Sequence, residues 1–517
     1  MQIGQKGKKA KGRKIPSAFC HFALVPFCLS SYAVSVSTRA IATSTLWQIA
    51  SQFTMAVLSA VSVKFVAMGL SRELAGAYNS AYGYLQLFAI LADFGLYAVS
   101  VREVAVSREK ERVLGGLLVI RTAITVISLG TAVIVAWLVP AWRGSPLSIG
   151  ISIASLVPFF TLLAGVLRTV FQIRYKMHLV FIAEVLQRIL TTGLMALVIL
   201  RGVRLSDDVR IYSWFLWIGA AGSLLLFVLS VFFAVRLMRI RPVFDRVLIK
   251  KLLKKAAPYG IAFLCIALYR QFDMTMIALL RDDFAVQNAA YGFASRITEM
   301  TFLVPTFLLN STLPILSERH SKGEPVKGLL GKTFFLILIF GSVSALFSFF
   351  WSWPIMRLLT AEAYLSRPGL PGADTALKLL SVPQFLNGMV LFSFYVLLAK
   401  HQWRALVSRM MLAVVLSIGL NLYFIPSAGF VGAIRTSTIV HAFLVIAIFP
   451  AAISAMPVSF PKKLIVKWAG FSIILALGLR LTAPWLETLP SIIIGLAAAT
   501  LALGLLGLIF RLKNDIM

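Results

Sequence analysis

Two pairs of oppositely charged residues lie inside long apolar stretches between residues 268 and 317. Arg270 and Asp273 form one pair, and Arg296 and Glu299 form the other. A spacing of three residues places both members of a pair on one face of a helix. A charge at the centre of a bilayer-spanning helix costs roughly 2.5–3.5 kcal/mol, so such residues usually face a protein interior or a watery cavity. Because guanidinium groups stay charged there and bind phosphate oxygens in pairs, this stretch predicts a site for an anionic group.

Charged residues in the apolar stretches as a whole are predominantly basic. The basic ones are Lys64, Arg121, Arg168, Arg188, Arg270, Arg296, Lys378, Arg435 and Arg480, and the acids are Asp93, Glu184, Asp273 and Glu299. Lysines and arginines near the ends of a span can extend to the membrane interface, which is the default interpretation for Lys64, Arg168, Lys378, Arg435 and Arg480. The surplus of positive charge predicts an interior suited to an anionic cargo.

Asp93 has a short acidic side chain at mid-span. The alternative to a role in substrate binding is an ion pair with Arg121 or Lys64 that only stabilises the fold. Glu184 and Arg188 are four residues apart. That they neutralise each other and fix the helix packing is as good an interpretation as a part in function, and the sequence favours neither interpretation. The residues that we predict to bind substrate are Arg270, Asp273, Arg296, Glu299, Asp93 and Arg121.

Composition places the chain among polytopic membrane proteins. Its 517 residues are 59% hydrophobic and only 13% charged. The net charge of +31 does not indicate nucleic-acid binding, because the basic residues fall in short loops between apolar spans. The three cysteines are scattered, and the sequence contains no metal-ligand cluster and no phosphate-binding loop for ATP. We therefore expect no metal and no cofactor.

The elements that must position these charges are apolar helices. Fourteen segments are long enough to cross a bilayer, which predicts an all-α polytopic membrane protein with about 14 transmembrane helices. Their approximate ranges are 43–69, 80–101, 113–139, 147–172, 179–200, 211–235, 256–280, 288–316, 328–353, 375–398, 405–426, 428–454, 464–481 and 491–510.

The distribution of lysine and arginine predicts the orientation. With the N-terminus in the cytoplasm, the cytoplasmic segments carry 33 of these residues and the opposite face carries 8. Both termini are therefore expected in the cytoplasm, with the chain in the inner (cytoplasmic) membrane. The basic and then apolar start of the chain resembles a secretory signal. Cleavage would conflict with this orientation, so a start codon placed too far upstream, or a basic arm lying on anionic lipid, is the preferred interpretation.

The basic loop from Arg236 to Lys255 divides the spans after the sixth helix. A weak internal repeat supports this division, since residues 75–84 and 285–293 open the second helix of each half with similar sequences. Such repeats are common in transporters whose halves move about a central site. We predict two pseudo-symmetric six-helix lobes around a central cavity, followed by two further helices. The predicted parts are a basic tail (1–40), an N-lobe (41–240), a C-lobe (241–455) and the C-terminal helices with a short tail (456–517).

Several motifs have the order and spacing of a known family. They are Leu70-Ser-Arg-Glu-Leu-Ala-Gly-Ala-Tyr, Ala92-Asp-Phe-Gly-Leu, Tyr269-Arg-Gln-Phe-Asp, Tyr291-Gly-Phe-Ala-Ser-Arg-Ile, Pro314-Ile-Leu-Ser and Asn421-Leu-Tyr-Phe-Ile-Pro-Ser-Ala-Gly-Phe-Val-Gly-Ala. Together they resemble the polysaccharide transporter or O-antigen flippase family of the multidrug/oligosaccharidyl-lipid/polysaccharide superfamily. The first motif has Ala75 where the family has glycine, and it lacks the Arg-Asp pattern of lipid II flippases.

The resemblance implies a membrane transporter rather than an enzyme. Its cargo would be a polyprenyl-pyrophosphate-linked glycan, moved by alternating access between two lobes to build surface polysaccharide such as the O-antigen of lipopolysaccharide. An ion gradient or the membrane potential would supply the energy, and we expect a monomer with membrane lipid as its surroundings. Two alternatives stay open. One is a multidrug antiporter of the same superfamily, which the positive interior disfavours. The other is a polysaccharide polymerase, which usually has a larger outer loop than residues 357–375.

Overall fold

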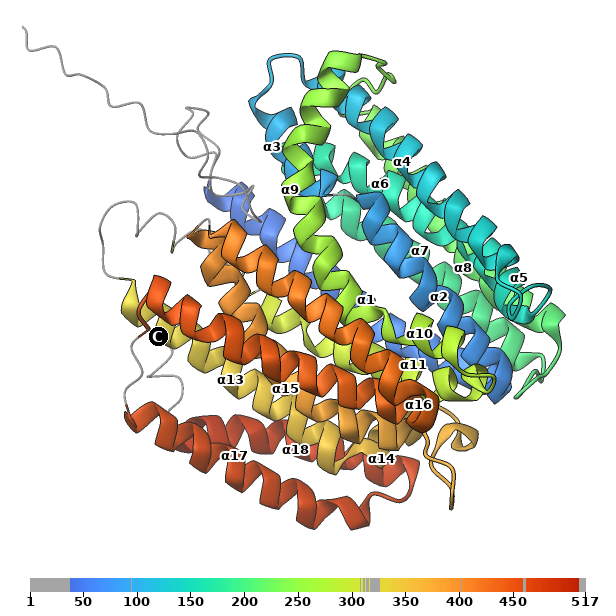
Figure 1. The fold of residues 1–517 in the computed structure, drawn as a ribbon, viewed down its shortest axis with the longest axis vertical. Coiled ribbons are helices and arrows are strands. Elements are labelled where there is room, and N and C mark those ends of the chain that lie inside the picture. The colour runs from blue at the N-terminus through green and yellow to red at the C-terminus, as the bar shows by residue number, and fades with distance from the viewer. Residues whose placement is uncertain are drawn as a thin grey trace, which may run out of the picture.

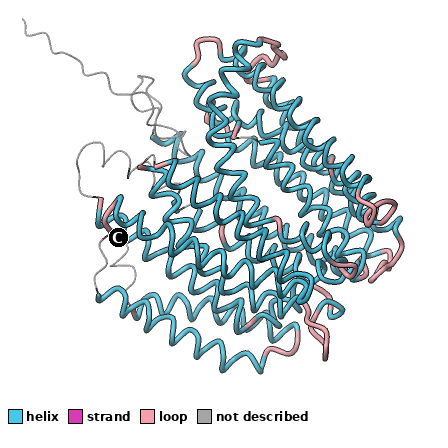
Figure 2. Tube along the Cα trace, in the orientation of Figure 1, coloured by secondary structure: helices cyan, strands magenta, loops and turns pink. Residues whose placement is uncertain are grey.

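The computed structural model describes residues 38–93, 95–306, 308–309, 312, 316, 326–400, 402–458 and 462–510. Most of the predicted basic tail and most of the motif at 314–317 lie outside these residues. The described part is built from helices joined by short turns, which confirms the predicted all-α class. Figure 2 shows these turns gathered at the ends of the helices.

Between residues 38 and 235, as far as the structure describes them, the first half of the chain forms eight helices: α1 (Thr38–Gly69), α2 (Arg72–Asp93), α3 (Leu96–Val106), α4 (Lys110–Leu138), α5 (Pro146–Ala154), α6 (Leu156–Ile173), α7 (Met177–Leu200) and α8 (Val209–Val235). The second half contains α9 (Arg246–Gln271), α10 (Asp273–Leu280), α11 (Phe284–Thr301), α13 (Lys327–Phe350), α14 (Ser352–Leu359), α15 (Ala373–Ala399), α16 (Trp403–Ala455), α17 (Lys462–Thr482) and α18 (Leu489–Ile509).

These helices account for the predicted crossings once their breaks are considered. Among the described residues, ten helical segments are long and apolar enough to cross a membrane, and α16 counts once among them although it bends at Gly429. Gly429 has a positive φ of 57°, a conformation that glycine adopts without strain, so two crossings meet there. The crossings predicted at α2, α9 and α11 are not among these ten, because these helices carry more polar side chains. Breaks at Ser155 and Phe272 divide two of the predicted crossings into α5–α6 and α9–α10.

The helices form two groups that meet at one end (Figure 1). One large hydrophobic cluster joins both halves there, with Ala77 and Tyr84 from α2 packed in the same core as Phe293 from α11 and Leu377 from α15. Away from this end there are two further cores: one around Phe392 and Leu444 in the second half, and one around Leu114 and Val170 in the first half, to which Leu252 and Ala256 of α9 also belong. The halves therefore share their large common core at one end, which we call the joined end.

Helices α2 and α11 make the closest contact at the joined end. A β-carbon on Gly76 would overlap the carbonyl oxygen of Ala285, and one on Gly292 would lie 2.5 Å from the β-carbon of Asn79. Glycine is therefore required at both positions for the two backbones to approach this closely. These glycines belong to the two copies of the internal repeat.

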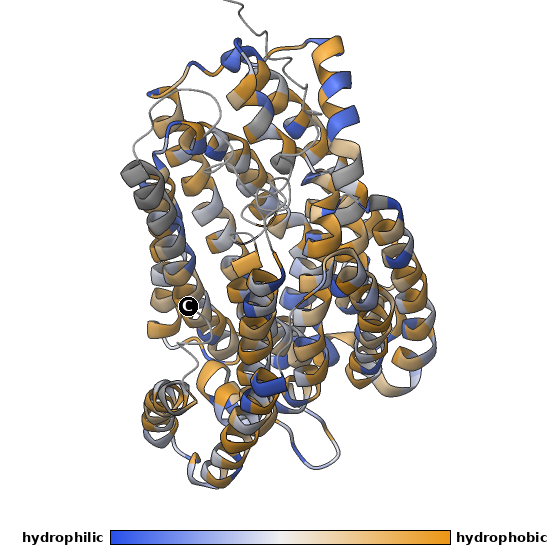
Figure 3. Cartoon of the chain, turned by 90° about the vertical axis from the view of Figure 1, so that its left-hand side faces the viewer, coloured by the Kyte–Doolittle hydropathy of each residue, from blue (hydrophilic) through white to orange (hydrophobic). Residues whose placement is uncertain are grey.

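The C-terminal pair α17 and α18 packs on α13 and α14 at the edge of the second half (Figure 1). Hydrophobic residues occupy much of the length of the helices, as the hydropathy colouring of Figure 3 shows. Helix α9 contacts α2, α3 and α4 as well as α16, so it touches both halves. The lobe boundary near residue 240 stays a prediction.

Candidate functional site

A cavity of about 580 Å³ lies between the two halves. Helices α1, α2, α6, α7 and α8 line it from the first half, and α9, α10 and α11 line it from the second. Its surface carries hydroxyl, amide and charged groups together with apolar ones. A space of this size and mixed polarity is typical of small-molecule and cofactor sites.

Three helices present one polar face each to this cavity. From α7 the lining residues are Glu184, Gln187, Arg188 and Thr191. Their spacings of three and four residues repeat the helical period, so one stripe of the helix faces the cavity. The corresponding lining stripes are Tyr78, Asn79, Tyr82, Gly83 and Gln86 on α2, and Ser295, Arg296, Glu299 and Met300 on α11.

Arg296 lies over two tyrosine rings. Its Cζ atom is 5.5 Å from the ring centroid of Tyr78 and 5.6 Å from that of Tyr82, and the two rings are 4.8 Å apart. A guanidinium over an aromatic face gains a cation–π attraction and keeps its N–H groups free to donate. The predicted partner Glu299 also lines the cavity and has an exposed side chain, but no ion pair joins it to Arg296 within the described residues.

Arg188 is the second cation of the cavity. The pair that its spacing predicts with Glu184 does not form, because Arg168 from α6 takes the Glu184 carboxylate at 2.9 Å and Ser51 donates a hydrogen bond to it. The Nε atom of Arg188 is buried and has no hydrogen-bond partner in the described structure. Arg188 thus presents an uncompensated guanidinium to the cavity, which favours an anionic ligand.

The cavity contains only part of the predicted surplus of positive charge. Of the nine basic residues assigned to the spans, only Arg188 and Arg296 line the cavity, together with the acids Glu184 and Glu299. Since Glu184 is already paired with Arg168, the described lining of the cavity holds two cations and one acid, Glu299, that has no ion pair among the described residues.

Asp273 and Arg270 do not form the predicted pair. The helix breaks at Phe272, so Asp273 begins α10 and no longer shares a helical face with Arg270. Asp273 is only 2% exposed and accepts hydrogen bonds from Tyr291 and Asn421, both at 2.9 Å, which makes it a buried link among α10, α11 and α16. Arg270 lies over the Phe302 ring, with 4.9 Å between its Cζ atom and the ring centroid. Neither Arg270 nor Asp273 is among the residues that line the cavity.

Asp93 and Arg121 form the ion pair that was the structural alternative for Asp93. Arg121 Nη1 lies 2.6 Å from Asp93 Oδ1 and also donates to the Asp93 carbonyl, while Arg121 Nε donates to the carbonyl of Leu162. Neither residue lines the central cavity. The pair links α2, α4 and α6 within the first half.

The joined end is closed by hydrogen bonds between the halves. Trp142 donates from Nε1 to the carbonyl of Ala278 at 2.9 Å. Tyr364 donates to the carbonyl of Leu70 at 2.6 Å, and burial raises the pKa of its phenol, so this donor keeps its proton. Lys64, expected to extend to the interface, donates instead to the carbonyls of Arg357 and Thr360.

Arg188, Tyr78, Tyr82 and the glutamines of the cavity were missed as candidate site residues. A signal for some of them was present, because residues 184, 187, 188 and 191 follow helical spacing on an otherwise apolar helix. Nothing comparable in the sequence marks Lys64 or Tyr364, whose partners are backbone carbonyls far along the chain.

Comparison with known proteins agrees with this architecture. Residues 41–320 match the family model described as "Polysaccharide biosynthesis protein", and residues 258–397 match the MatE model. The sequence search found no matching curated protein.

Solved structures match along most of their length. "Lipid II flippase MurJ, inward closed conformation" is 17% identical, with 91% of this chain and 98% of that chain covered and a TM-score of 0.66. An inward-facing multidrug resistance MATE family transporter of the MOP superfamily is 14% identical, with coverages of 85% and 100% and a TM-score of 0.59. The MATE multidrug transporter DinF-BH is 14% identical, with coverages of 81% and 96% and a TM-score of 0.55. At these identities the likeness is one of fold, and these three structures are a flippase and two transporters rather than enzymes.

Proposed function

Since the chain belongs to the polysaccharide biosynthesis protein family, we propose that it is a flippase for a polyprenyl-pyrophosphate-linked oligosaccharide. The cargo would enter the cavity between the halves and leave on the other side of the membrane, after the joined end has opened and the opposite end has closed. The fold is that of flippases and transporters in the same superfamily.

The observation that carries this proposal is the pair of cavity arginines, neither of which has a carboxylate partner in the part of the chain that the structure describes. Arg188 and Arg296 are the groups suited to a pyrophosphate, because a guanidinium binds phosphate oxygens with two parallel N–H donors. The surrounding amides and hydroxyls of Gln86, Gln187 and Gln271 and of the two tyrosines match the hydrogen-bonding groups of a sugar.

The direction of transport follows from the predicted orientation. With both termini in the cytoplasm, the joined end faces outward, and the cavity is loaded from the cytoplasmic side. Surface polysaccharide of the O-antigen kind is the proposed destination of the glycan. Location in the inner membrane, the monomeric state and coupling to an ion also belong to this proposal.

The test replaces the two arginines in a strain that lacks the chromosomal gene. Arg188→Gln and Arg296→Gln should each lower export of the lipid-linked glycan by roughly ten- to a hundredfold, the value of one charge-assisted hydrogen bond. Arg435→Gln is the matched control, because Arg435 is exposed and is not among the residues that line the cavity. Equal amounts of each variant in the membrane exclude a folding defect. Normal surface polysaccharide in the double variant would refute the proposal.

A multidrug antiporter is the second candidate. The unpaired carboxylate of Glu299 in the cavity and the MatE match over residues 258–397 favour it, because a carboxylate can bind a cationic drug. Drug accumulation in cells that overproduce the protein distinguishes the two functions. A flippase leaves accumulation unchanged, whereas an antiporter lowers it, and Glu299→Gln abolishes that effect.

A further inference from the structure

Residues 352–372 lead through α14 to the start of α15 at the joined end, and we call this segment the latch. It comprises α14 and the loop that follows, including a 3-10 turn at Glu362–Tyr364. Although it belongs to the second half, it makes hydrogen bonds to the first half at three places. We propose that the latch is a gate that keeps the joined end closed until its bonds to the first half are released.

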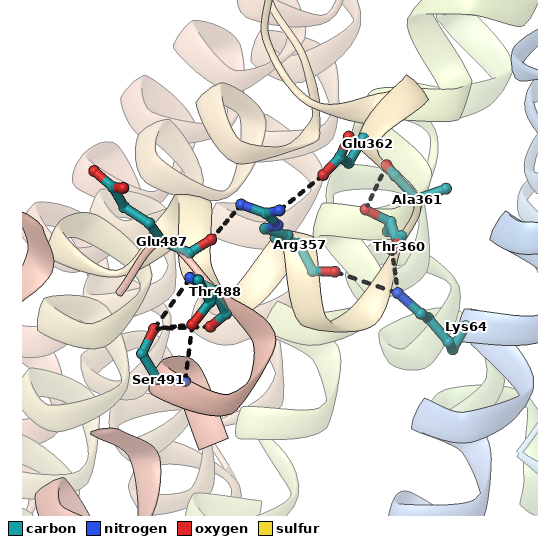
Figure 4. Close-up of polar contacts among 8 residues, drawn as sticks. All are labelled: Lys64, Arg357, Thr360, Ala361, Glu362, Glu487, Thr488 and Ser491. Carbon is teal, nitrogen blue, oxygen red and sulfur yellow. Dashed lines mark hydrogen bonds and ion pairs between the residues drawn. The ribbon is translucent and has the colours of Figure 1, made fainter. Parts of the chain in front are cut away.

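The first bond caps a helix of one half with a side chain from the other. The last carbonyls of a helix have no partner within it and carry a partial negative charge. Figure 4 shows Lys64 of α1 directed at the end of α14, where its ammonium group donates to the carbonyls of Arg357, at 3.3 Å, and of Thr360. A lysine is suited to this position, because it supplies both hydrogen bonds and a compensating charge.

The second bond is donated by a tyrosine of the latch to the backbone of the first half. Tyr364 is fully buried and donates to the carbonyls of Leu70 and Ser71, at 2.6 and 3.1 Å. Its ring meets the Phe293 ring edge-on at 5.0 Å. A third, more exposed bond joins Arg72 Nη2 to the carbonyl of Pro371 at 3.3 Å.

The latch is held firmly on its own side. Arg357 pairs with Glu362 at 2.8 Å and donates to the carbonyl of Glu487, which precedes α18 (Figure 4). Asp374, at the start of α15, accepts hydrogen bonds from the backbone N–H and the hydroxyl of Ser366. The latch is thus bound to the second half and to the C-terminal helices. When the halves separate at the joined end, the bonds of Lys64, Tyr364 and Arg72 must break.

This inference rests on the alternating access of the proposed function and not on the nature of the cargo. Two substitutions remove the donors with little change of shape: Lys64→Met and Tyr364→Phe. The matched controls are Lys378→Met and Tyr423→Phe, since both residues are exposed and Lys378 lies over the Phe349 ring of its own half.

Spin labels report whether the joined end opens. Cysteines are introduced at the exposed residues Arg143 and Ser427, one in each half, after replacement of Cys20, Cys28 and Cys265. Double electron–electron resonance is then recorded on the full chain in nanodiscs without cargo. Each latch variant should raise the long-distance population roughly three- to tenfold, the effect expected from one lost hydrogen bond, and the controls should match the parent.

An unchanged distance distribution in both latch variants, with normal amounts of folded protein, would overturn the latch. The result is separable from the proposed function, because no glycan is present. If the latch variants open the joined end while the Arg188 and Arg296 variants export glycan normally, the latch stands and the flippase proposal fails. The reverse pair of outcomes would retain the flippase and reject the latch.

Discussion

Asn79 on α2 and Asn288 on α11 occupy equivalent places in the two copies of the internal repeat, three residues before a Tyr-Gly pair, and they bond across the boundary between the halves. Asn79 Nδ2 donates to the carbonyl of Asn288 at 3.3 Å, and Asn288 Nδ2 donates to Ser80 at 2.9 Å. Both side chains are almost completely buried. The repeat that the sequence carries is therefore also the contact between the two halves.

Replacing Asn288 by alanine should weaken this contact. The change removes the hydrogen bonds to Ser80 and to the carbonyl of Met274 and leaves buried polar groups without partners, at a cost of roughly 1–3 kcal/mol. The apparent melting temperature in detergent should fall. An unchanged melting temperature would show that the two asparagines do not stabilise the joined end.

Gly76→Ala tests the close approach of α2 and α11 directly. Its new methyl group would overlap the Ala285 carbonyl, and overpacking of this kind costs roughly 1–3 kcal/mol or more. Gly130→Ala on α4 is the control, because no atom lies within 4 Å of its β-carbon position and alanine favours a helix. We expect Gly76→Ala to lower the yield of folded protein, whereas Gly130→Ala keeps or raises it. Equal behaviour of the two variants would contradict the packing model.

Arg121→Ala should destabilise the first half by roughly 3–5 kcal/mol, because it leaves the Asp93 carboxylate without its partner in a largely apolar setting. The double variant Asp93→Asn with Arg121→Met removes both charges and should recover most of the stability. Thermal unfolding and glycan export are measured together on both variants. A stable double variant that exports no glycan would restore the prediction that this pair binds substrate.

Tyr82 is expected to act on Arg296 through its ring. Tyr82→Phe keeps the cation–π contact and should leave export near the level of the parent protein, whereas Tyr82→Leu should lower it roughly two- to tenfold. The comparison separates the ring from the hydroxyl. If the phenylalanine variant is as impaired as the leucine variant, the hydroxyl contributes more than the ring.

Asp245 provides a pH dependence outside the membrane spans. It caps α9 by accepting from the backbone N–H groups of Val247 and Leu248, and it pairs with Arg112 at 2.7 Å. The Leu248 N–H and then Arg112 hold the pKa of Asp245 below its ordinary value. A carboxyl whose pKa is lower in the folded state stabilises the protein above its unfolded pKa of about 3.9, and this stability is lost as the pH falls through the folded pKa.

The difference in melting temperature between the parent and Asp245→Ala should therefore be largest near neutral pH and should shrink in acid. Asp245→Asn retains the helix cap without the charge, so it should lie between the two at neutral pH. A difference that stays constant from pH 7 to pH 3 would mean that the carboxylate charge has no part in the effect.

The sequence alone determined the class of fold, the apolar character of the spans and the family. Span length follows from bilayer thickness, and the cost of exposed backbone in lipid makes each apolar span a helix, so these features depend only on local composition. The same local reasoning identified Arg296 and Glu299, whose helix continues unbroken through both residues, as polar groups facing a cavity.

Only the tertiary structure decided which of the other charges meet. The break at Phe272 separated Arg270 from Asp273, and Arg168 displaced Arg188 from Glu184 through a contact between two helices. Lys64 and Tyr364 donate hydrogen bonds to backbone carbonyls nearly 300 residues away in the sequence. Helical spacing determines which side chains share a face, but the rotation of each helix, its breaks and its neighbours determine what that face contacts. Local sequence therefore determines the spans of this protein, and the packing of those spans determines which side chains line its cavity.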